Sequence, residues 1–333
     1  MNKSATYQVV FMDVLAPAVQ RVIASVFGPP FETRFALNYD ARHQTELCRA
    51  ADFLVPGWAQ LTGEMLEAAE RVQAVHKWGI GVDRIDVQAA RRLGIPVAIT
   101  AGSNAGPVAE LAITLMLAVY RRIYYVNREM RAGKWPKSEM RETCFQIHGK
   151  TIGLVGFGNI GRKLARRLAG FEPGAILYCD RYAAPAEVEH ALGARRVELP
   201  ELLSRSDIVS LHAPYDESTR HLIDASAIRR MKKGAVLINT ARGELVDEAA
   251  LASALKRGHL MGAGLDAFDP EPPDPGNPLL ALDQVIVTPH AGGGVFDNVA
   301  PVAAHVLRNL QRFVAGESIA AQDLIVSENR RTP

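Results

Sequence analysis

Short apolar runs alternate with amphipathic stretches along most of the chain. The runs are only a few residues long, which suits strands buried on both faces, and the stretches between them repeat apolar residues at helical spacing. Strands are expected at 7–12, 52–55, 72–77, 95–100, 151–156, 175–180, 207–212, 235–239, 262–268 and 284–290. Alternating strands and helices are typical of parallel βαβ units, so the pattern predicts an α/β fold.

Helices are expected at 16–27, 42–51, 62–69, 86–94 and 298–316. A longer helix is predicted from about Asn104 to Met130, because no proline follows Pro107, and a proline suits the first helical turn. The proline-rich stretch 269–278 interrupts the alternation and is expected to be a rigid loop.

Length and charge limit the classes of protein to consider. A chain of 333 residues exceeds what one hydrophobic core usually covers, so about two domains are expected. The net charge of +2 gives no footprint for nucleic acid, and the basic run 120–134 fits a solvated or subunit-facing helix surface better than a nucleic-acid patch. The longest apolar stretch, 108–120, carries Glu110 and is too short to cross a bilayer. The N-terminus lacks the apolar core of a signal peptide. From the charge and the apolar stretches together, neither a nucleic-acid nor a membrane partner is expected.

The three cysteines, Cys48, Cys144 and Cys179, are scattered along the chain, with no C-x-x-C pair and no histidine at ligand spacing. This spacing argues against a metal site or a disulfide framework, and it favours a reducing cytoplasm as the location.

A glycine-rich motif, Gly156, Gly158 and Gly161, follows one expected strand directly and opens a helix at Asn159 and Ile160. Glycines at these positions allow a tight turn and close approach of the backbone to a pyrophosphate, and the helix N-terminus offers N–H groups to the phosphates. An acidic residue, Asp180, stands at the end of the next strand, where a carboxylate accepts hydrogen bonds from ribose hydroxyls. The motif therefore predicts a dinucleotide site that favours NAD, and the adjacent Arg181 leaves NADP open.

Three chemically active residues follow later strands: Arg242, Glu271 and His290. Since ligands bind at the carboxyl ends of strands in open parallel sheets, we expect these side chains to meet there. Arginine offers a planar fork for a carboxylate, histidine exchanges protons near neutral pH, and a glutamate on the other ring nitrogen would orient the imidazole and favour its cation. Together they suit hydride transfer at a 2-oxo or 2-hydroxy acid, with the substrate carboxylate on Arg242.

These motifs give the chain a resemblance to the D-isomer-specific 2-hydroxyacid dehydrogenases. The resemblance covers most of the length and rests on the segments "GIGVDRID", "HGKTIGLVGFGNIG", "SDIVSLHAPYDESTRHLID", "MKKGAVLINTARGELVDEAAL", "GAGLDAFDPEPP" and "VIVTPHAGG", which occur in the family's order. It implies that Arg242, Glu271 and His290 are the catalytic residues.

The resemblance also implies further contacts. Substrate is expected at Lys77, Gly79, Ile80 and Gly81 as well as at Arg242 and His290. Cofactor is expected at Gly156, Gly158, Asn159, Ile160, Gly161, Asp180, His212, Ala213, Pro214, Thr219, Thr240, Ala241, Asp266 and Gly292.

The implied architecture has two Rossmann/flavodoxin-like domains with parallel sheets and an active-site cleft between them. The NAD-binding Rossmann domain is expected at 102–292, and the substrate-binding domain is expected to combine 1–101 with 293–333. The resemblance further implies a homodimer with the long-helix region at its interface.

The substrate stays open at this point. Glyoxylate and hydroxypyruvate are the default expectation, and a basic Lys77 leaves a phosphoglycerate dehydrogenase as an alternative. Formate dehydrogenases carry glutamine where this chain has Glu271, which argues against that branch. A non-catalytic NAD(H)-sensing protein of the corepressor type shares the catalytic residues, but the chain ends soon after its last expected helix. Two departures from the family pattern, Leu111 for histidine and Asp216 for threonine, leave the subfamily open.

Overall fold

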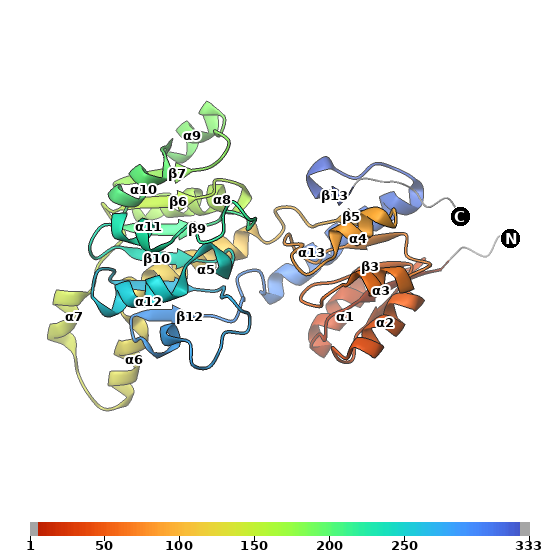
Figure 1. Ribbon diagram of the computed structural model, residues 1–333, viewed down its shortest axis with the longest axis horizontal. Helices are drawn as coiled ribbons and strands as arrows, with labels where there is room; N and C mark the ends of the chain where they lie inside the picture. Colours follow the sequence, from red (N-terminus) through yellow and green to blue (C-terminus); the bar gives the residue numbers. More distant parts are fainter. Residues whose placement is uncertain (1–5, 327–333) are drawn as a thin grey trace. The chain divides into compact units, whose positions relative to one another are not determined.

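A computed structural model describes residues 6–326 of the chain. It divides into two compact units, one formed by Met1–Asn104 with Val295–Pro333 and the other by Ala105–Gly294, each built around its own sheet (Figure 1). The first five and last seven residues, which belong to the ends of the expected substrate-binding domain, lie outside the described residues.

The sheet of the second unit has seven strands, all parallel. They are β6 (Thr151–Val155), β7 (Ala175–Cys179), β8 (Ala194–Arg196), β9 (Ile208–Leu211), β10 (Val236–Asn239), β11 (Gly262–Leu265) and β12 (Val285–Val287). Their order in space, β12-β11-β10-β9-β6-β7-β8, is the doubly wound order of a dinucleotide-binding fold with one strand added at an edge.

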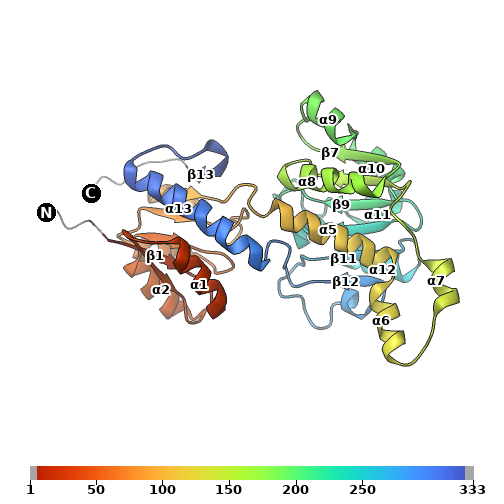
Figure 2. The same cartoon turned by 180° about the vertical axis from the view of Figure 1, so that it is seen from behind.

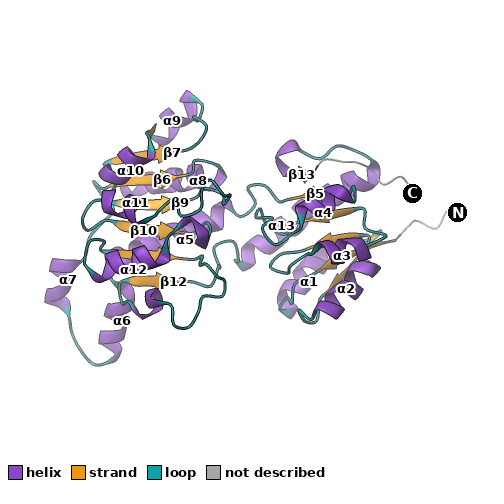
Figure 3. Ribbon diagram, in the orientation of Figure 1, coloured by secondary structure: helices purple, strands orange, loops and turns teal. Residues whose placement is uncertain are grey.

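Helices cover both faces of this sheet (Figures 1 and 3). On one face, α5 (Ala105–Tyr120) and α8 (Asn159–Leu168) bury Leu115, Met116 and Leu164 against the strands. On the other face, α10 (Leu199–Arg205), α11 (Ala225–Arg230) and α12 (Glu248–Lys256) bury Leu202 and their other apolar side chains. The unit also contains α6 (Ile123–Arg131), α7 (Lys137–Thr143), α9 (Ala186–Leu192) and the short 3-10 turns Ala169–Phe171, Gly243–Leu245 and Pro278–Ala281.

The sheet of the first unit has six strands in the order β13-β5-β4-β3-β1-β2. They are β1 (Tyr7–Phe11), β2 (Phe31–Phe35), β3 (Phe53–Val55), β4 (Ala74–His76), β5 (Val97–Ala98) and β13 (Leu324–Val326). The first five strands are parallel in the flavodoxin-like order, and β13 adds an antiparallel edge. The predicted fold class, two doubly wound parallel sheets, is thus confirmed.

Helices also cover both faces of this six-stranded sheet of the first unit. The helices α1 (Pro17–Val26) and α13 (Val299–Ala315) lie on one face, which Figure 2 presents, and bury Ile23 and Val306. The helices α2 (Ala41–Ala50), α3 (Gly63–Ala68) and α4 (Val87–Arg92) bury Leu47 and Leu66 on the other face. Two 3-10 turns, Phe296–Asn298 and Ala321–Asp323, complete the unit.

The long helix expected from Asn104 to Met130 is wrong, because the chain breaks it into α5 and α6. Arg122 adopts a left-handed conformation with φ 48°, and the carbonyl of Tyr120 accepts a hydrogen bond from the amide of Phe145. That carbonyl is therefore not used by a following helical turn.

Three strands were not expected, and each lies at a sheet edge. The strand β2 alternates the exposed charged residues Glu32 and Arg34 with less exposed residues, and β8 exposes both of its arginines. The expected strands 262–268 and 284–290 end early, at Leu265 and Val287, so that the residues after them form loops. Within residues 6–326, no helix is both long and apolar enough to cross a membrane.

Candidate active site

The predicted catalytic residues follow three neighbouring strands of the second unit. Arg242 comes three residues after β10, Glu271 lies in the loop after β11, and His290 comes three residues after β12. These strands are adjacent and parallel, so their carboxyl ends meet at one edge of the sheet. The glycine-rich turn after β6, Asp180 after β7 and His212 after β9 follow strands at the same edge.

A carboxylate–imidazole pair is formed at this edge. Nδ1 of His290 lies 2.9 Å from Oε1 and 3.0 Å from Oε2 of Glu271. Glu271 also accepts a hydrogen bond from the amide of Phe268. Burial raises the pKa of Glu271, but the hydrogen bond and charge of His290 outweigh it, with help from Arg242, and the pKa falls below its usual value. Glu271 is therefore ionised at neutral pH and can support a protonated imidazole.

The turn that carries His290 is held by a buried aspartate. The carboxylate of Asp266, which is 2% exposed, accepts hydrogen bonds from the hydroxyl of Thr288 at 2.5 Å and from the amides of Ala291 and Gly292 at 2.8 Å and 2.9 Å. His290 itself has φ 51°, a left-handed conformation that a side chain adopts at some cost. Asp266 therefore fixes the backbone on both sides of the histidine.

Arg242 is positioned by the end of its own strand. The buried side chain of Asn239 donates to the carbonyl of Arg242 at 2.8 Å and accepts from the amide of Ala241 at 3.0 Å. Gly243 follows, and a Cβ there would collide with the backbone of Phe268, so only glycine lets this turn pack against the loop that leads to Glu271. The two loops are thereby fixed to each other.

Each glycine of the motif has a distinct environment. Gly156 has φ +95°, and a Cβ there would lie 2.6 Å from the backbone of His212 and Ala213. A Cβ on Gly161 would collide with the carbonyl of Gly156. A Cβ on Gly158 would meet nothing within 4 Å, so this glycine borders open space. These environments match the tight turn, the close helix–strand packing and the open approach to phosphates that the glycines of a dinucleotide site provide.

The helix α8 begins directly after this turn at Asn159, and no side chain caps its N-terminus. Its first N–H groups, which include those of Ile160, are therefore available to an anion. The carboxylate of Asp180 accepts from the amides of Phe157 at 2.7 Å and Tyr182 at 3.1 Å, which attaches it to the glycine-rich turn.

Two polar side-chain atoms at the strand ends are buried with no hydrogen-bond partner in the described part of the chain. They are Nδ1 of His212 and the hydroxyl oxygen of Thr240. Burial lowers the pKa of His212 to about 3, so its ring is neutral at physiological pH. Buried polar groups are nearly always hydrogen-bonded, so both atoms are natural contacts for a bound molecule.

The other expected cofactor contacts follow three strands, β9, β10 and β12. Ala213, Pro214 and Thr219 lie in the loop after β9, where the hydroxyl of Thr219 closes a turn by donating to the carbonyls of Pro214 and Asp216. Ala241 follows Thr240 after β10, and Gly292 belongs to the turn held by Asp266.

The expected substrate residues of the first unit follow β4. Lys77 donates from its ammonium to the carbonyl of Gly57. The amide of Gly79 donates to the hydroxyl of Thr100 at 3.0 Å, so it is already used within the fold. Ile80 and Gly81 follow Gly79 directly in the chain. All four residues are half-buried.

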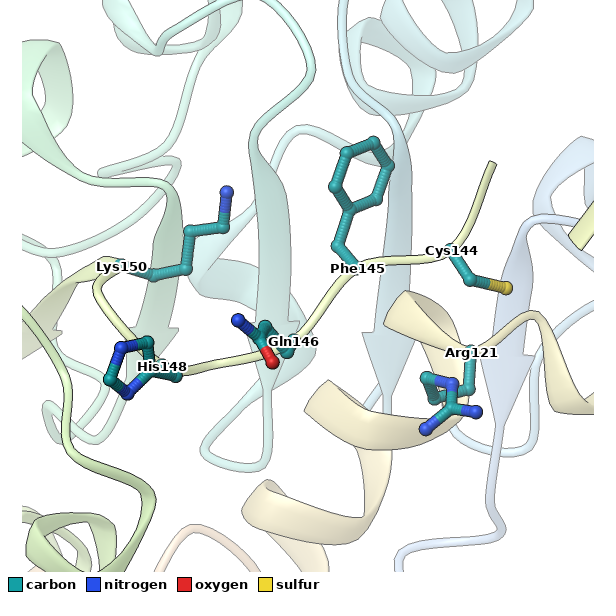
Figure 4. Close-up of a pocket in the computed structure, with 6 residues that line it drawn as sticks. All are labelled: Arg121, Cys144, Phe145, Gln146, His148 and Lys150. Atoms are coloured by element: carbon teal, nitrogen blue, oxygen red, sulfur yellow. The ribbon is translucent and has the colours of Figure 1, made fainter. Parts of the chain in front are cut away.

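A cavity of about 490 Å³ lies elsewhere in the second unit. Figure 4 shows its lining residues: Arg121, Cys144, Phe145, Gln146, His148 and Lys150. Lys150 immediately precedes β6, so the cavity lies by the amino end of a strand whose carboxyl end carries the glycine-rich turn. It is separate from the candidate active site.

Two positioning residues, Asn239 and Thr100, were not predicted. Both are fully buried polar residues, and each is the last residue of an expected strand. A polar residue in an otherwise apolar run was the available signal, since such groups are buried only where they have hydrogen bonds to make.

The doubly wound sheet and the glycine-rich turn define a dinucleotide-binding α/β enzyme, and comparisons with known proteins identify its family. Residues 113–292 match the family model of the NAD-binding domain of D-isomer specific 2-hydroxyacid dehydrogenases. The chain belongs to this family. It is an oxidoreductase that acts on a CH–OH group with a nicotinamide cofactor.

Similar proteins are found among curated sequences and solved structures. The chain is 40% identical over 259 residues to a glyoxylate reductase of Korarchaeum cryptofilum, covering 77% of each chain. It is 42% identical over 235 residues to a hydroxypyruvate reductase of Thermotoga maritima, covering 70% of this chain and 74% of the relative. An NAD-dependent formate dehydrogenase of Staphylococcus aureus, solved with NAD, superposes with a TM-score of 0.84 at 26% identity, covering 97% of this chain and all of the other.

Proposed function

We propose that this enzyme interconverts a small 2-oxo acid and its D-2-hydroxy acid, with Arg242, Glu271 and His290 as the catalytic residues. The observation that carries the proposal is the contact of both Glu271 oxygens with Nδ1 of His290. Because Nδ1 contacts Glu271, we assign the exchange of the proton with the substrate to the other ring nitrogen, Nε2.

Proton transfer and binding of the substrate carboxylate are assigned to three side chains of the second unit. Protonated His290 donates from Nε2 to the substrate oxygen as C2 is reduced, and neutral His290 takes the hydroxyl proton in the reverse direction. Glu271 stabilises the imidazolium and keeps the ring oriented. Arg242 binds the substrate carboxylate through its planar guanidinium.

The residues present fit a nicotinamide dinucleotide. The open space at Gly158, the uncapped start of α8 and the buried atoms without partners at His212 and Thr240 support this fit. We assign the pyrophosphate to the turn 156–161 and the nicotinamide half to Thr240, Ala241 and Asp266. When bound, the reduced nicotinamide supplies the hydride.

We further propose that NAD is preferred over NADP. Asp180 would accept hydrogen bonds from the adenosine ribose, and its negative charge would repel a 2′-phosphate. For the substrate we propose glyoxylate or hydroxypyruvate, which the relatives' names support. The alternative of a phosphoglycerate dehydrogenase rests on Lys77, and phosphohydroxypyruvate as a substrate tests it.

We propose a cytoplasmic homodimer that pairs through the region 120–145. Large apolar side chains of this region are exposed, among them Ile123, Tyr124, Trp135 and Phe145. Figures 1 and 3 show α6 and α7 extending away from the sheet of their unit, as arms that bind a second subunit do. Sedimentation equilibrium tests this: the wild type should be a dimer, and Ile123→Glu should shift it toward the monomer.

NADH consumption by the purified protein tests the reaction. The panel should hold glyoxylate, hydroxypyruvate, pyruvate, larger 2-oxo acids and phosphohydroxypyruvate, each repeated with NADPH. Highest kcat/KM for one of the two smallest oxo acids with NADH is the expected result. No turnover with any oxo acid, despite measurable NADH binding, would instead favour the non-catalytic, dinucleotide-sensing alternative.

A further inference from the structure

Arg181, the residue after Asp180, is engaged by the loop that follows β9. Its guanidinium lies 2.7 Å from Oδ2 of Asp216 and 2.6 Å from the hydroxyl of Ser218. Arg181 lies 35 positions before Asp216 in the chain, so the contact depends on the fold of the second unit. Arg181 is 58% exposed and Asp216 42% exposed, so water reaches the pair and the contact can be exchanged for another.

Asp216 is itself held rigidly for this contact. Its Oδ1 accepts from the amide and the hydroxyl of Ser218, at 2.8 Å and 2.5 Å, and its own amide donates to the hydroxyl of Thr219 at 2.8 Å. The hydrogen bonds from Ser218, followed by that from Arg181, lower the pKa of Asp216 to about 2. The carboxylate is therefore charged throughout the physiological range.

The position of this pair matters for the cofactor. In a doubly wound sheet, the residue at the end of the second strand marks the 2′ position of the adenosine ribose, where an arginine accommodates the 2′-phosphate of NADP. Here Asp180 occupies the strand end and Arg181 follows at once. An arginine at this place is a ready partner for a phosphate unless another group binds it.

We propose that Asp216 is a cofactor-specificity residue: by binding Arg181 it withholds that guanidinium from a 2′-phosphate. The inference deepens the proposed preference for NAD and rests on it. Asp216 acts through Arg181, so its effect depends on that arginine being present.

Removing the charge of Asp216 should release Arg181. The variant Asp216→Asn keeps the size of the side chain, and Asp216→Thr introduces the residue usual for the family. Either should tighten NADPH binding relative to NADH by about tenfold, which is about 1.4 kcal/mol. Arg181→Gln in the Asp216→Asn background should abolish that gain, whereas Arg181→Gln alone should change the ratio little.

Titration of the protein with NADH and NADPH, followed by nicotinamide fluorescence, measures the two dissociation constants without any 2-oxo acid. Glu201→Gln is the matched control, since Glu201 is a half-exposed acid that pairs with Arg195 and Arg205 in the same unit. A gain in the NADPH ratio for Asp216→Asn that disappears with Arg181→Gln supports the inference. An unchanged ratio, a gain that survives loss of Arg181, or an equal gain in Glu201→Gln overturns it.

The proposed reaction and this inference fail separately. Because the titration contains no oxo acid, it decides the role of Asp216 even if every oxo acid is inert. A protein that reduces an oxo acid but binds NADPH as tightly as NADH overturns the inference while leaving the reaction in place.

Discussion

The carboxylate of Glu271 contacts Nδ1 of His290 with both of its oxygens, at 2.9 Å and 3.0 Å. The two residues are 19 positions apart and follow the adjacent strands β11 and β12. The contact fixes the ring orientation and lowers the pKa of Glu271, so a negative charge faces the imidazole over the whole neutral range. The pair therefore holds the imidazole in one orientation with a negative charge behind it, as a histidine that gives a proton to an alkoxide requires.

Replacing His290 with alanine should lower kcat by about 10²–10⁴-fold, because general acid–base help is lost. NADH binding should persist, since the proposed cofactor contacts of the glycine-rich turn are untouched. Steady-state kinetics with the best oxo acid and NADH titration check both points. His148→Ala is the control, because His148 is exposed and pairs with Glu172 in the same unit. Near-normal turnover in His290→Ala would refute the catalytic assignment.

Glu271→Gln should change the pH dependence of oxo-acid reduction. Glutamine keeps a hydrogen bond to His290 but loses the charge that stabilises the imidazolium, so the rate of oxo-acid reduction should begin to fall at a lower pH than in the wild type. The wild-type carboxylate has a lowered pKa, so it is ionised throughout the pH range of the measurement. Reduction rates between pH 5 and 9 measure the shift. Identical wild-type and variant profiles would show that Glu271 only shapes the loop.

Asp266→Asn should weaken the turn that holds His290. One carboxylate oxygen becomes an NH₂ group facing the amide donors of Ala291 or Gly292, and such a mismatch costs about 1–3 kcal/mol. Urea unfolding without cofactor measures the loss of unfolding free energy. Asp274→Asn, an exposed aspartate of the proline-rich loop, should change it by less than about 0.5 kcal/mol. Equal losses in the two variants would contradict the role of Asp266.

Much of the fold was predictable because apolar periodicity reports burial directly. The central strands, buried on both faces, read as short apolar runs, and the glycine-rich turn is a local pattern with fixed spacing. Edge strands are different: β2 carries Glu32 and Arg34 and is recognised only by its pairing with β1. The break after α5 also depends on a distant residue, since Phe145 takes the carbonyl of Tyr120.

In the candidate site, too, local patterns were predictable and contacts between distant segments were not. The residues at strand ends could be predicted because parallel topology brings carboxyl ends together. The contacts that hold them in place could not, since Asp266 with the 288–292 turn and Asp216 with Arg181 join segments far apart in the sequence. The sequence shows Asp266 and Asp216 only as polar residues, and the packed fold determines which groups they contact.

Two glycines of the motif should respond differently to alanine. Gly156→Ala should lower the unfolding free energy by more than about 2 kcal/mol, because φ is +95° and a Cβ would lie 2.6 Å from the backbone of His212. Gly158→Ala should stay within about 0.5 kcal/mol of wild type, since nothing lies within 4 Å of its Cβ. It should nevertheless raise the NADH dissociation constant about tenfold or more, because the methyl group occupies the space assigned to the pyrophosphate. Unfolding curves and NADH titration separate the two effects, and intact NADH binding in Gly158→Ala would contradict the assignment.

A buried histidine in the first unit should make stability depend on pH. His76 is fully buried; its Nδ1 lies 3.2 Å from the carbonyl of Lys77, and its Nε2 lies 3.0 Å from the side-chain nitrogen of Asn309. Asn309 also donates to Asp323 at 3.1 Å, so both hydrogens of its amide are used. Burial lowers the pKa of His76 to about 4, and a proton on Nε2 would face the N–H of Asn309.

The sign of the effect follows from the lowered pKa. The unfolded chain takes up a proton at His76 as the pH falls through about 6.5, whereas the folded protein resists until about pH 4, so stability should fall across this window. The contribution between pH 7 and pH 5 is about 2 kcal/mol. Urea unfolding at the two pH values should show a loss of stability in the wild type that is smaller by about this amount in His76→Gln. His148→Gln, at an exposed position, should retain the wild-type loss. Equal losses in wild type and His76→Gln would mean that His76 is protonated alike in the folded and unfolded states.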